Sequence, residues 1–168
     1  KTLDVFAAYS RPFKAPNVDD FSAQVPDFTS NISLQPQQAD TYELGASVTR
    51  AALTAKATGF YTRIKNEIIF NRVNFQTQNF DTERFGAEFS ARVELPERGL
   101  RGYATYTFVD AEFRKGQFKE HTIPGTPDHT FNAGIGYSPF QSFWVNLDWQ
   151  LVQDFFRIND FNNTLSSD

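Results

Sequence analysis

The stretch FWVNLDWQLV, residues 143–152, alternates between large apolar side chains and mostly polar ones. Its apolar members stand at every second position from Phe143 to Leu151. Asn146, Asp148 and Gln150 stand between them. Because successive side chains of a β-strand point to opposite faces, this period of two predicts a strand with one apolar face. That face must meet either a protein core or lipid.

The same alternation recurs at other places along the chain, whereas no segment has a convincing helical period. These places are LDVFAAY (3–9), YELGASV (42–48), LTAKATGFY (53–61), FGAEFSARVEL (85–95), YATYTFV (103–109) and FNAGIGY (131–137). Together with residues 143–152 they predict an all-β chain of about seven antiparallel strands.

The predicted connections between these strands are of two kinds that take turns. Short ones lie near Arg50–Ala52, Pro96–Gly99 and Ser138–Gln141. Long polar ones lie at Arg11–Asp40, Lys65–Thr82 and Lys115–Asp128, and another begins near Asp154. Long loops are unusual inside a compact domain. A sheet with short turns at one end and long loops at the other is typical of outer-membrane barrels.

The amino-acid composition excludes several kinds of site and partner. The 168-residue chain has 19 Phe, no Cys and a net charge of −4, with no block of like charge. The absence of Cys excludes disulfides and thiolate metal sites. The weak negative charge gives a nucleic-acid partner no electrostatic support. No apolar run approaches the roughly 18 residues of a membrane helix, and no secretory signal opens the chain.

Two folds satisfy this pattern: a transmembrane barrel with its apolar face toward lipid, and a soluble β-sandwich or jelly roll that binds carbohydrate. The apolar faces are rich in Ala, Phe and Tyr rather than in Val, Ile and Leu, which favours the barrel. Tyr9, Tyr61, Tyr106 and Tyr137 stand where an aromatic girdle would lie. Single-chain bacterial barrels have an even strand number, so seven strands predict an interior segment of a larger barrel.

Several motifs resemble those of the TonB-dependent outer-membrane receptors of the siderophore type, and they occur in the same order as in that family. They are YSRPFKAPNVDDF (9–21), LQPQQADTYELG (34–45), FYTRIKNEI (60–68), ERFGAEFSARVEL (83–95), GYATYTFVDAEF (102–113) and PGTPDHTFNAGIGY (124–137). Phe13–Pro16 resembles the F-[KR]-A-P signature of that family, and Gln37 stands where the family commonly has Glu. The resemblance covers nearly the whole chain.

The resemblance implies that residues 1–168 are an interior segment of a barrel of about 22 strands, without the N-terminal plug domain that closes such barrels. It implies a multi-pass protein of the Gram-negative outer membrane that binds and imports a ferric siderophore or a similar iron complex, without enzymatic chemistry. The implied partners are the plug and remaining strands of the same receptor, TonB through the plug, the iron chelate, membrane lipid and lipopolysaccharide.

Other functions stay open at this point. Cobalamin or carbohydrate could replace iron as the cargo of the same receptor family, and a porin-like barrel without a plug is a different class. A plug domain with a TonB box before Lys1 would support the receptor, whereas strands that follow a signal peptide directly would support the porin.

The candidate site residues fall into two groups. Aromatic and charged side chains in the long loops Asn17–Gln35, Asn66–Asn79, Gly116–Ile123 and Asn159–Ser167 are candidates for ligand contact, because loops on a rigid scaffold usually carry recognition. They are Arg72, Phe75, Phe80, Phe118 and Phe161. Residues expected to face the plug or lumen are Arg11, Lys14, Glu43 and Glu88. Each of these also has a purely structural interpretation, as a loop surface, a strand end or a hydrogen-bonded wall.

We expect no cofactor, metal site or catalytic centre. His121 and His129 are the only histidines and lie in or beside one long loop, without the carboxylates of a metal site. No acid–base pair, phosphate-binding loop or nucleophile elbow stands out.

Overall fold

The computed structural model describes residues 2–21, 31–71, 75–140, 142–153, 156–157 and 160–165. One antiparallel sheet dominates them, with two short helical turns, α1 (Val18–Phe21) and η1 (Pro96–Arg98). Its strands are β1 (Thr2–Ser10), β2 (Phe13–Lys14), β3 (Gln37–Arg50), β4 (Leu53–Asn71), β5 (Gln76–Leu95), β6 (Leu100–Phe113), β7 (His129–Phe140) and β8 (Phe143–Gln153). Among the described residues, no helix is long and apolar enough to cross a bilayer.

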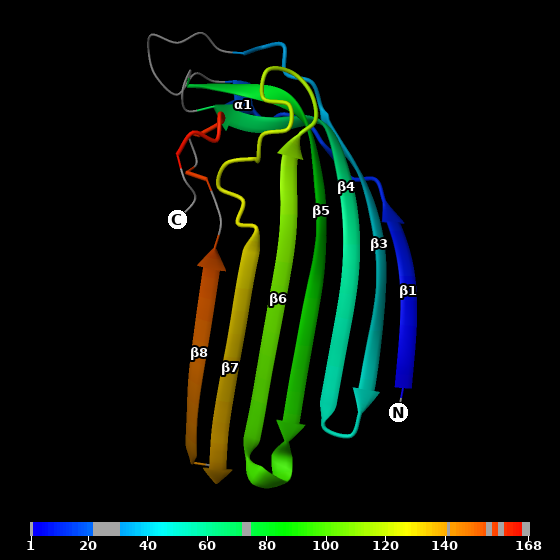
Figure 1. Ribbon diagram of the computed structural model, residues 1–168, viewed down its shortest axis with the longest axis vertical. Coiled ribbons are helices and arrows are strands. Elements are labelled where there is room, and N and C mark those ends of the chain that lie inside the picture. Colours follow the sequence, from blue (N-terminus) through cyan, green and yellow to red (C-terminus); the bar gives the residue numbers. More distant parts are fainter. Residues whose placement is uncertain are drawn as a thin grey trace.

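The strands follow the simplest possible order, β1-β3-β4-β5-β6-β7-β8, with the two-residue β2 paired to β3 beside β1. The all-β prediction and its seven principal strands are therefore confirmed. Figure 1 shows the short turns gathered at one end of the curved sheet and the long connections at the other. A two-residue turn, Ala51–Ala52, joins β3 to β4, and η1 with Gly99 joins β5 to β6. The predicted asymmetry of the two ends is thus present.

The sheet carries its apolar side chains on the exposed, outer face. Leu147 opposes Ile135 on β7 and is 70% exposed, and every described residue of β8 is exposed. Phe143 and Trp149 also find no second layer of the described chain above them. A soluble sandwich requires that layer, so the opening stretch directs its apolar face outward and its Asn–Asp–Gln face toward the concave side.

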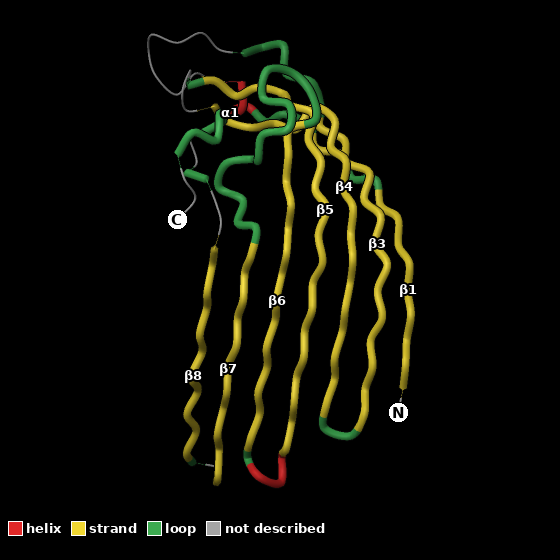
Figure 2. Tube along the Cα trace, in the orientation of Figure 1, coloured by secondary structure: helices red, strands yellow, loops and turns green. Residues whose placement is uncertain are grey.

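The loop end of the sheet differs from the sequence prediction. Residues predicted as long loops continue as strand, because β3 starts at Gln37 and β4 and β5 run for 19 and 20 residues. The prediction of an irregular loop over Lys65–Thr82 is therefore wrong for most of its length. A β-bulge lies between Ile64 and Glu67, where Asn66 has φ 55°. Bulges bend strands, and beyond this one the β4–β5 hairpin leans across the concave side (Figure 2).

The buried core lies at the loop end and not within the wall. Ala111 and Phe113 at the end of β6 pack with Phe118 and Ile123 of the β6–β7 connection and with Phe161, which follows β8. Ile69, Phe80 and Val109 border this cluster. The molecule therefore combines an inside-out wall with a conventional small core under its loops.

Candidate functional site

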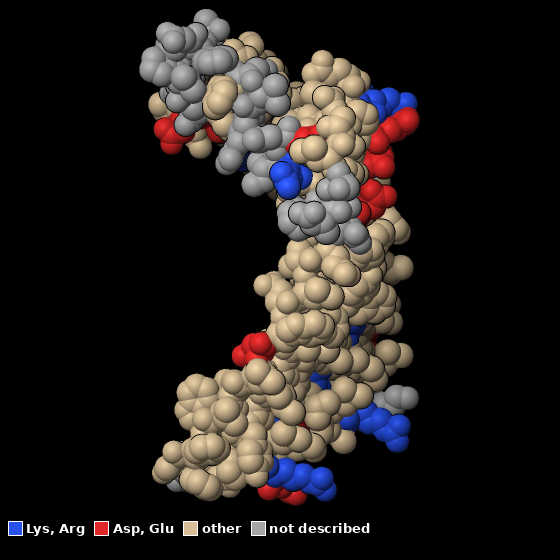
Figure 3. Space-filling model, turned by 60° about the vertical axis from the view of Figure 1, so that its left-hand side comes forward, with Lys and Arg blue, Asp and Glu red and all other residues tan. Residues whose placement is uncertain are grey.

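The candidate site is the loop end of the barrel wall, where the bent hairpin and two long loops gather over the concave side. Figure 3 shows the resulting C-shaped profile, with the loop end projecting over the hollow. Charged residues gather near the two ends of the strands, and the middle of the visible surface is mostly uncharged. A membrane-spanning wall needs such an uncharged band.

Polar contacts hold the hairpin in its bent position. The main-chain N–H of Asn66 donates to Asp81 Oδ1 at 3.2 Å, and the Asn79 amide donates to Asn66 O at 2.8 Å. The Ile68 N–H donates to Gln37 Oε1 at 3.2 Å. Because Asn66 has the positive φ that Asn tolerates better than most residues, the sequence and these bonds agree on the position of the bend.

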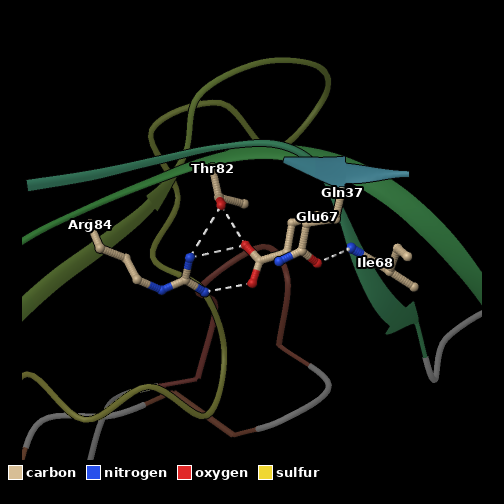
Figure 4. Close-up of polar contacts among 5 residues, drawn as sticks. All are labelled: Gln37, Glu67, Ile68, Thr82 and Arg84. Atoms are coloured by element: carbon tan, nitrogen blue, oxygen red, sulfur yellow. Dashed lines mark hydrogen bonds and ion pairs between the residues drawn. The ribbon is translucent and has the colours of Figure 1, made fainter. Parts of the chain in front are cut away.

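A mostly buried ion pair lies on the inner side of the bend. Arg84 of β5 binds Glu67 of β4 through two nitrogens, at 2.7 and 3.1 Å, and the Thr82 hydroxyl also contacts this carboxylate (Figure 4). Thr82 is fully buried. A bidentate Arg–carboxylate pair has a defined geometry, so this cluster fixes β4 against β5 where both strands leave the regular wall. The sequence analysis did not identify these residues, since their pairing depends on the bulge.

Most of the aromatic ligand candidates occupy the loop core. Phe118 and Phe161 are only 8% and 3% exposed, with ring centroids 5.2 Å apart. Phe80 packs on both, at 6.1 and 6.0 Å. Rings in this position hold the loops together and offer little surface to a ligand. Phe75, at the hairpin tip, is 39% exposed. Arg72 lies outside the described residues.

The β6–β7 connection and the segment after β8 form one unit. Asn163 accepts from the Thr122 N–H at 2.6 Å and donates back to Thr122 O at 3.1 Å. The Gly125 N–H donates to Phe156 O at 2.8 Å. Asp160 accepts the main-chain N–H groups of Thr164 and Leu165, which lowers the pKa of its carboxyl group. His121 contacts Phe161 O through Nδ1 at 2.9 Å, a structural role.

The inner, concave face of the wall carries polar side chains. Glu43 and Glu88 lie on this concave face and are exposed, and their contact with the plug or lumen stays a prediction. The Tyr103 hydroxyl of β6 donates to Asp148 Oδ1 of β8 at 2.8 Å, passing over Gly134 of β7. A Cβ on Gly134 would come within 2.4 Å of Asp148 Oδ1, so the absence of a side chain there permits this contact across three strands.

An aromatic row crosses the outer face near the loop end. Tyr9, Tyr42, Tyr61 and Phe85 stand opposite one another on four neighbouring strands, and the first two rings are 5.1 Å apart. Tyr9 donates its hydroxyl proton to Asp40 at 2.7 Å. Such a girdle marks the membrane interface. The sequence indicated individual tyrosines, but only the register aligns them.

Charged residues continue the outer face beyond this row. Asp40, Arg63, Glu83 and Glu112 are successive cross-strand neighbours. Arg11 joins them, 3.3 Å from Asp40, so it lies on the outer face and not in the lumen as expected. Lys14 is exposed on β2, beyond the regular wall. Within the described ranges, no group of three or more His, Asp or Glu side chains could hold a metal ion.

A family model described as "TonB dependent receptor-like, beta-barrel" matches residues 1–168. The chain belongs to the TonB-dependent receptor β-barrel family. Members of this family are outer-membrane proteins, so the predicted family and location are confirmed. The inside-out wall, the aromatic row and the asymmetric connections agree with this membership.

Solved structures with the same fold include the ferric yersiniabactin uptake receptor FyuA from Yersinia pestis, with a TM-score of 0.74, 18% identity, and coverage of 99% of this chain and 26% of that one. The ferric citrate transporter FecA has a TM-score of 0.71 and 22% identity, covering 98% and 26%. The copper transporter OprC has a TM-score of 0.71 and 16% identity, covering 93% and 24%. This TonB-dependent barrel segment thus spans about a quarter of each receptor, and the likeness concerns the fold.

Proposed function

We propose that the chain is part of the barrel wall of an outer-membrane receptor that binds and imports a ferric siderophore or a similar iron complex. The observation that supports it most is the inside-out wall: its apolar face is exposed, its polar face is concave, and the described parts of the long connections gather at one end. Binding at the loop end and release of a path through the lumen require no covalent chemistry.

The sheet edges support a larger barrel. Within the described chain, β1 and β8 each have a strand neighbour on one side only. An open strand edge in lipid leaves main-chain groups unpaired at a cost of several kcal/mol each. Further strands of the same receptor therefore pair with β1 and β8, and an N-terminal plug, which TonB acts on, fills the lumen against Glu43 and Glu88.

The outer face supports contact with lipid and lipopolysaccharide. The aromatic row lies at the level of the membrane interface, and the charged row beyond it, with Asp40, Arg63 and Glu83, reaches the headgroup level. Both rows lie on the side of the long loops, which is the external side in outer-membrane barrels.

The proposal that the cargo contains iron is based on the family resemblance and on the names of the structurally similar receptors. FyuA and FecA are named for ferric complexes, whereas OprC is named for copper. Our proposal for ligand contact places the cargo beside the exposed loop-end surface, with Phe75 and Arg72 as contact candidates. Phe80, Phe118 and Phe161 act instead by holding that surface in place.

Uptake by the full-length receptor tests this proposal. Cells that express it as their only such receptor should accumulate radioactive iron from one ferric chelate and should lose this uptake when tonB is deleted. Iron uptake that persists without tonB would indicate a passive porin. Binding of cobalamin or an oligosaccharide, without competition by any ferric chelate, would overturn iron as the cargo.

A further inference from the structure

One short part of β5 has a partner strand on one side only. Residues 76–80 pair with β4, but the pairing of β5 with β6 begins at Thr82 opposite Phe113. The other edge of this part, inside the loop end, has no strand beside it within the described chain. Unpaired strand edges are templates for pairing with another chain.

The hydrogen-bond pattern between β4 and β5 gives the direction in which the N–H and C=O groups of β5 point. The Ile68 N–H points away from β5, because it donates to Gln37 of β3. Ile68 therefore forms a non-hydrogen-bonded pair with Asn79. In such a pair the N–H and C=O of each residue point away from the partner strand, so those of Asn79 point toward the open edge. No hydrogen bond to a described residue occupies them.

The carbonyl groups of the two neighbours of Asn79 on this edge already accept hydrogen bonds. Thr77 O accepts from the Asn31 side chain at 3.0 Å, and Asp81 O accepts from the Arg114 N–H at 2.7 Å. Each lies two residues from Asn79, a distance of about 7 Å along a strand. Among the described residues, the carbonyl groups on either side of Asn79 are therefore occupied, whereas the N–H and C=O of Asn79 are not.

A cavity of about 610 Å³ lies at this opening, lined from three segments of the chain. Its polar lining includes Asn31, Gln78 and Gln117. The only charges in the lining, Lys115 and Asp81, pair with each other at 2.7 Å. The volume falls within the range of small-molecule sites, and the lining is electrically neutral.

We propose that this cavity, which we call the edge cavity, binds an extended, uncharged, amide-bearing chain that pairs with the N–H and C=O of Asn79. An amide unit presents one donor and one acceptor at the spacing of a strand, as in β-strand addition. A peptide and the peptide portion of a larger ligand share this chemistry. The site is defined by the ladder and does not depend on iron as the cargo.

Hydrogen exchange on the full-length receptor tests the edge cavity. The Asn79 amide should exchange freely without ligand and at least about tenfold more slowly with saturating N-acetyl-trialanine methylamide, because exchange then requires the ligand to leave. Slow exchange before any addition, or no change on addition, would overturn the proposal. Maltotriose has a comparable size and no amide, so protection by maltotriose in place of the peptide would also overturn it.

Two variants and one ligand pair complete the test. Gln117→Trp fills the cavity and should abolish protection by the peptide, whereas Lys119→Trp, an exposed position on the same loop outside the lining, should leave it unchanged. A peptide hydroxamate in ferric and iron-free forms separates the two ligand sources. Protection by both forms is expected if the site binds the amide chain, and protection by the ferric form alone would contradict it.

Discussion

The wall and the loop end of this chain use the same residue type in opposite ways. Phe85, in the wall, is 58% exposed on the outer face, whereas Phe113, at the end of β6, is 1% exposed under the loops. Both lie in strands with the same alternating pattern. The outer face of the wall meets lipid, whereas the loop end extends beyond the bilayer into water and must bury its apolar groups.

This difference shows that a single strand can pass from the membrane into water. β6 directs Tyr106 outward in the wall and Phe113 inward at its end. The apolar side of the strand therefore changes where the strand leaves the membrane. Matched substitutions in the two regions should show that apolar side chains stabilise the wall by facing outward and the loop end by being buried.

We expect the largest effect from Phe113→Ala. It removes the centre of a closed aromatic cluster, and truncation of a buried Phe costs about 3–5 kcal/mol. The loops that carry Phe118 and Phe161 should then become open to proteolysis while the wall stays folded. Limited proteolysis of the full-length receptor measures this effect. Phe85→Ala is the matched control in the wall, and an equal gain in loop cleavage there would refute the distinction between the regions.

Leu147→Arg should have the next largest effect. Placing Arg on the lipid face costs about 2–4 kcal/mol near the bilayer midplane, so the free energy of unfolding in lipid vesicles should fall. Gln150→Arg on the same strand faces the lumen and should change it much less. If both variants lose the same stability in a urea titration, the outward orientation of the apolar face is wrong.

A smaller effect is expected from Arg84→Met at the boundary between the regions. It leaves the mostly buried Glu67 carboxylate without its charged partner, a loss of about 1–3 kcal/mol. The rate of hydrogen exchange should rise in the β4–β5 hairpin beyond the bulge and not in the part of the wall near the short turns. Arg92→Met breaks an exposed ion pair with Glu94 and should matter little. Unchanged exchange beyond the bulge in Arg84→Met would show that the ion pair does not hold the bend.

The smallest effect concerns pH at Asp160. Its pKa is lowered by two main-chain N–H groups, so the stabilisation is present above the ordinary carboxyl pKa of about 3.9 and is lost as the pH falls through the lower pKa of the folded state. Exchange at Thr164 and Leu165, corrected for its intrinsic pH dependence, should therefore stay constant from pH 7 to 5 and accelerate only in stronger acid. In Asp160→Asn this acceleration should be absent.

Much of the wall could be predicted from the sequence. The period of two located the strands, since the pattern of a half-exposed strand is local. The motifs from Tyr9 to Tyr137 identified the family, and the alternation assigned Glu43 and Glu88 to the polar face of their strands. The loop end could not be predicted in this way. In the sequence, Phe80, Phe118 and Phe161 stand in or beside long polar segments that were predicted to be loops. They are buried only because three segments far apart in the chain pack against one another.

The sequence by itself determined the alternation, the short turns and the family, because these depend on neighbours within a few residues. Only the tertiary structure decided the bend at Asn66, the outer position of Arg11 and the open ladder at Asn79. Each of these depends on cross-strand register and on loop contacts between residues far apart in the chain, and a one-residue change of register would send every side chain to the opposite face.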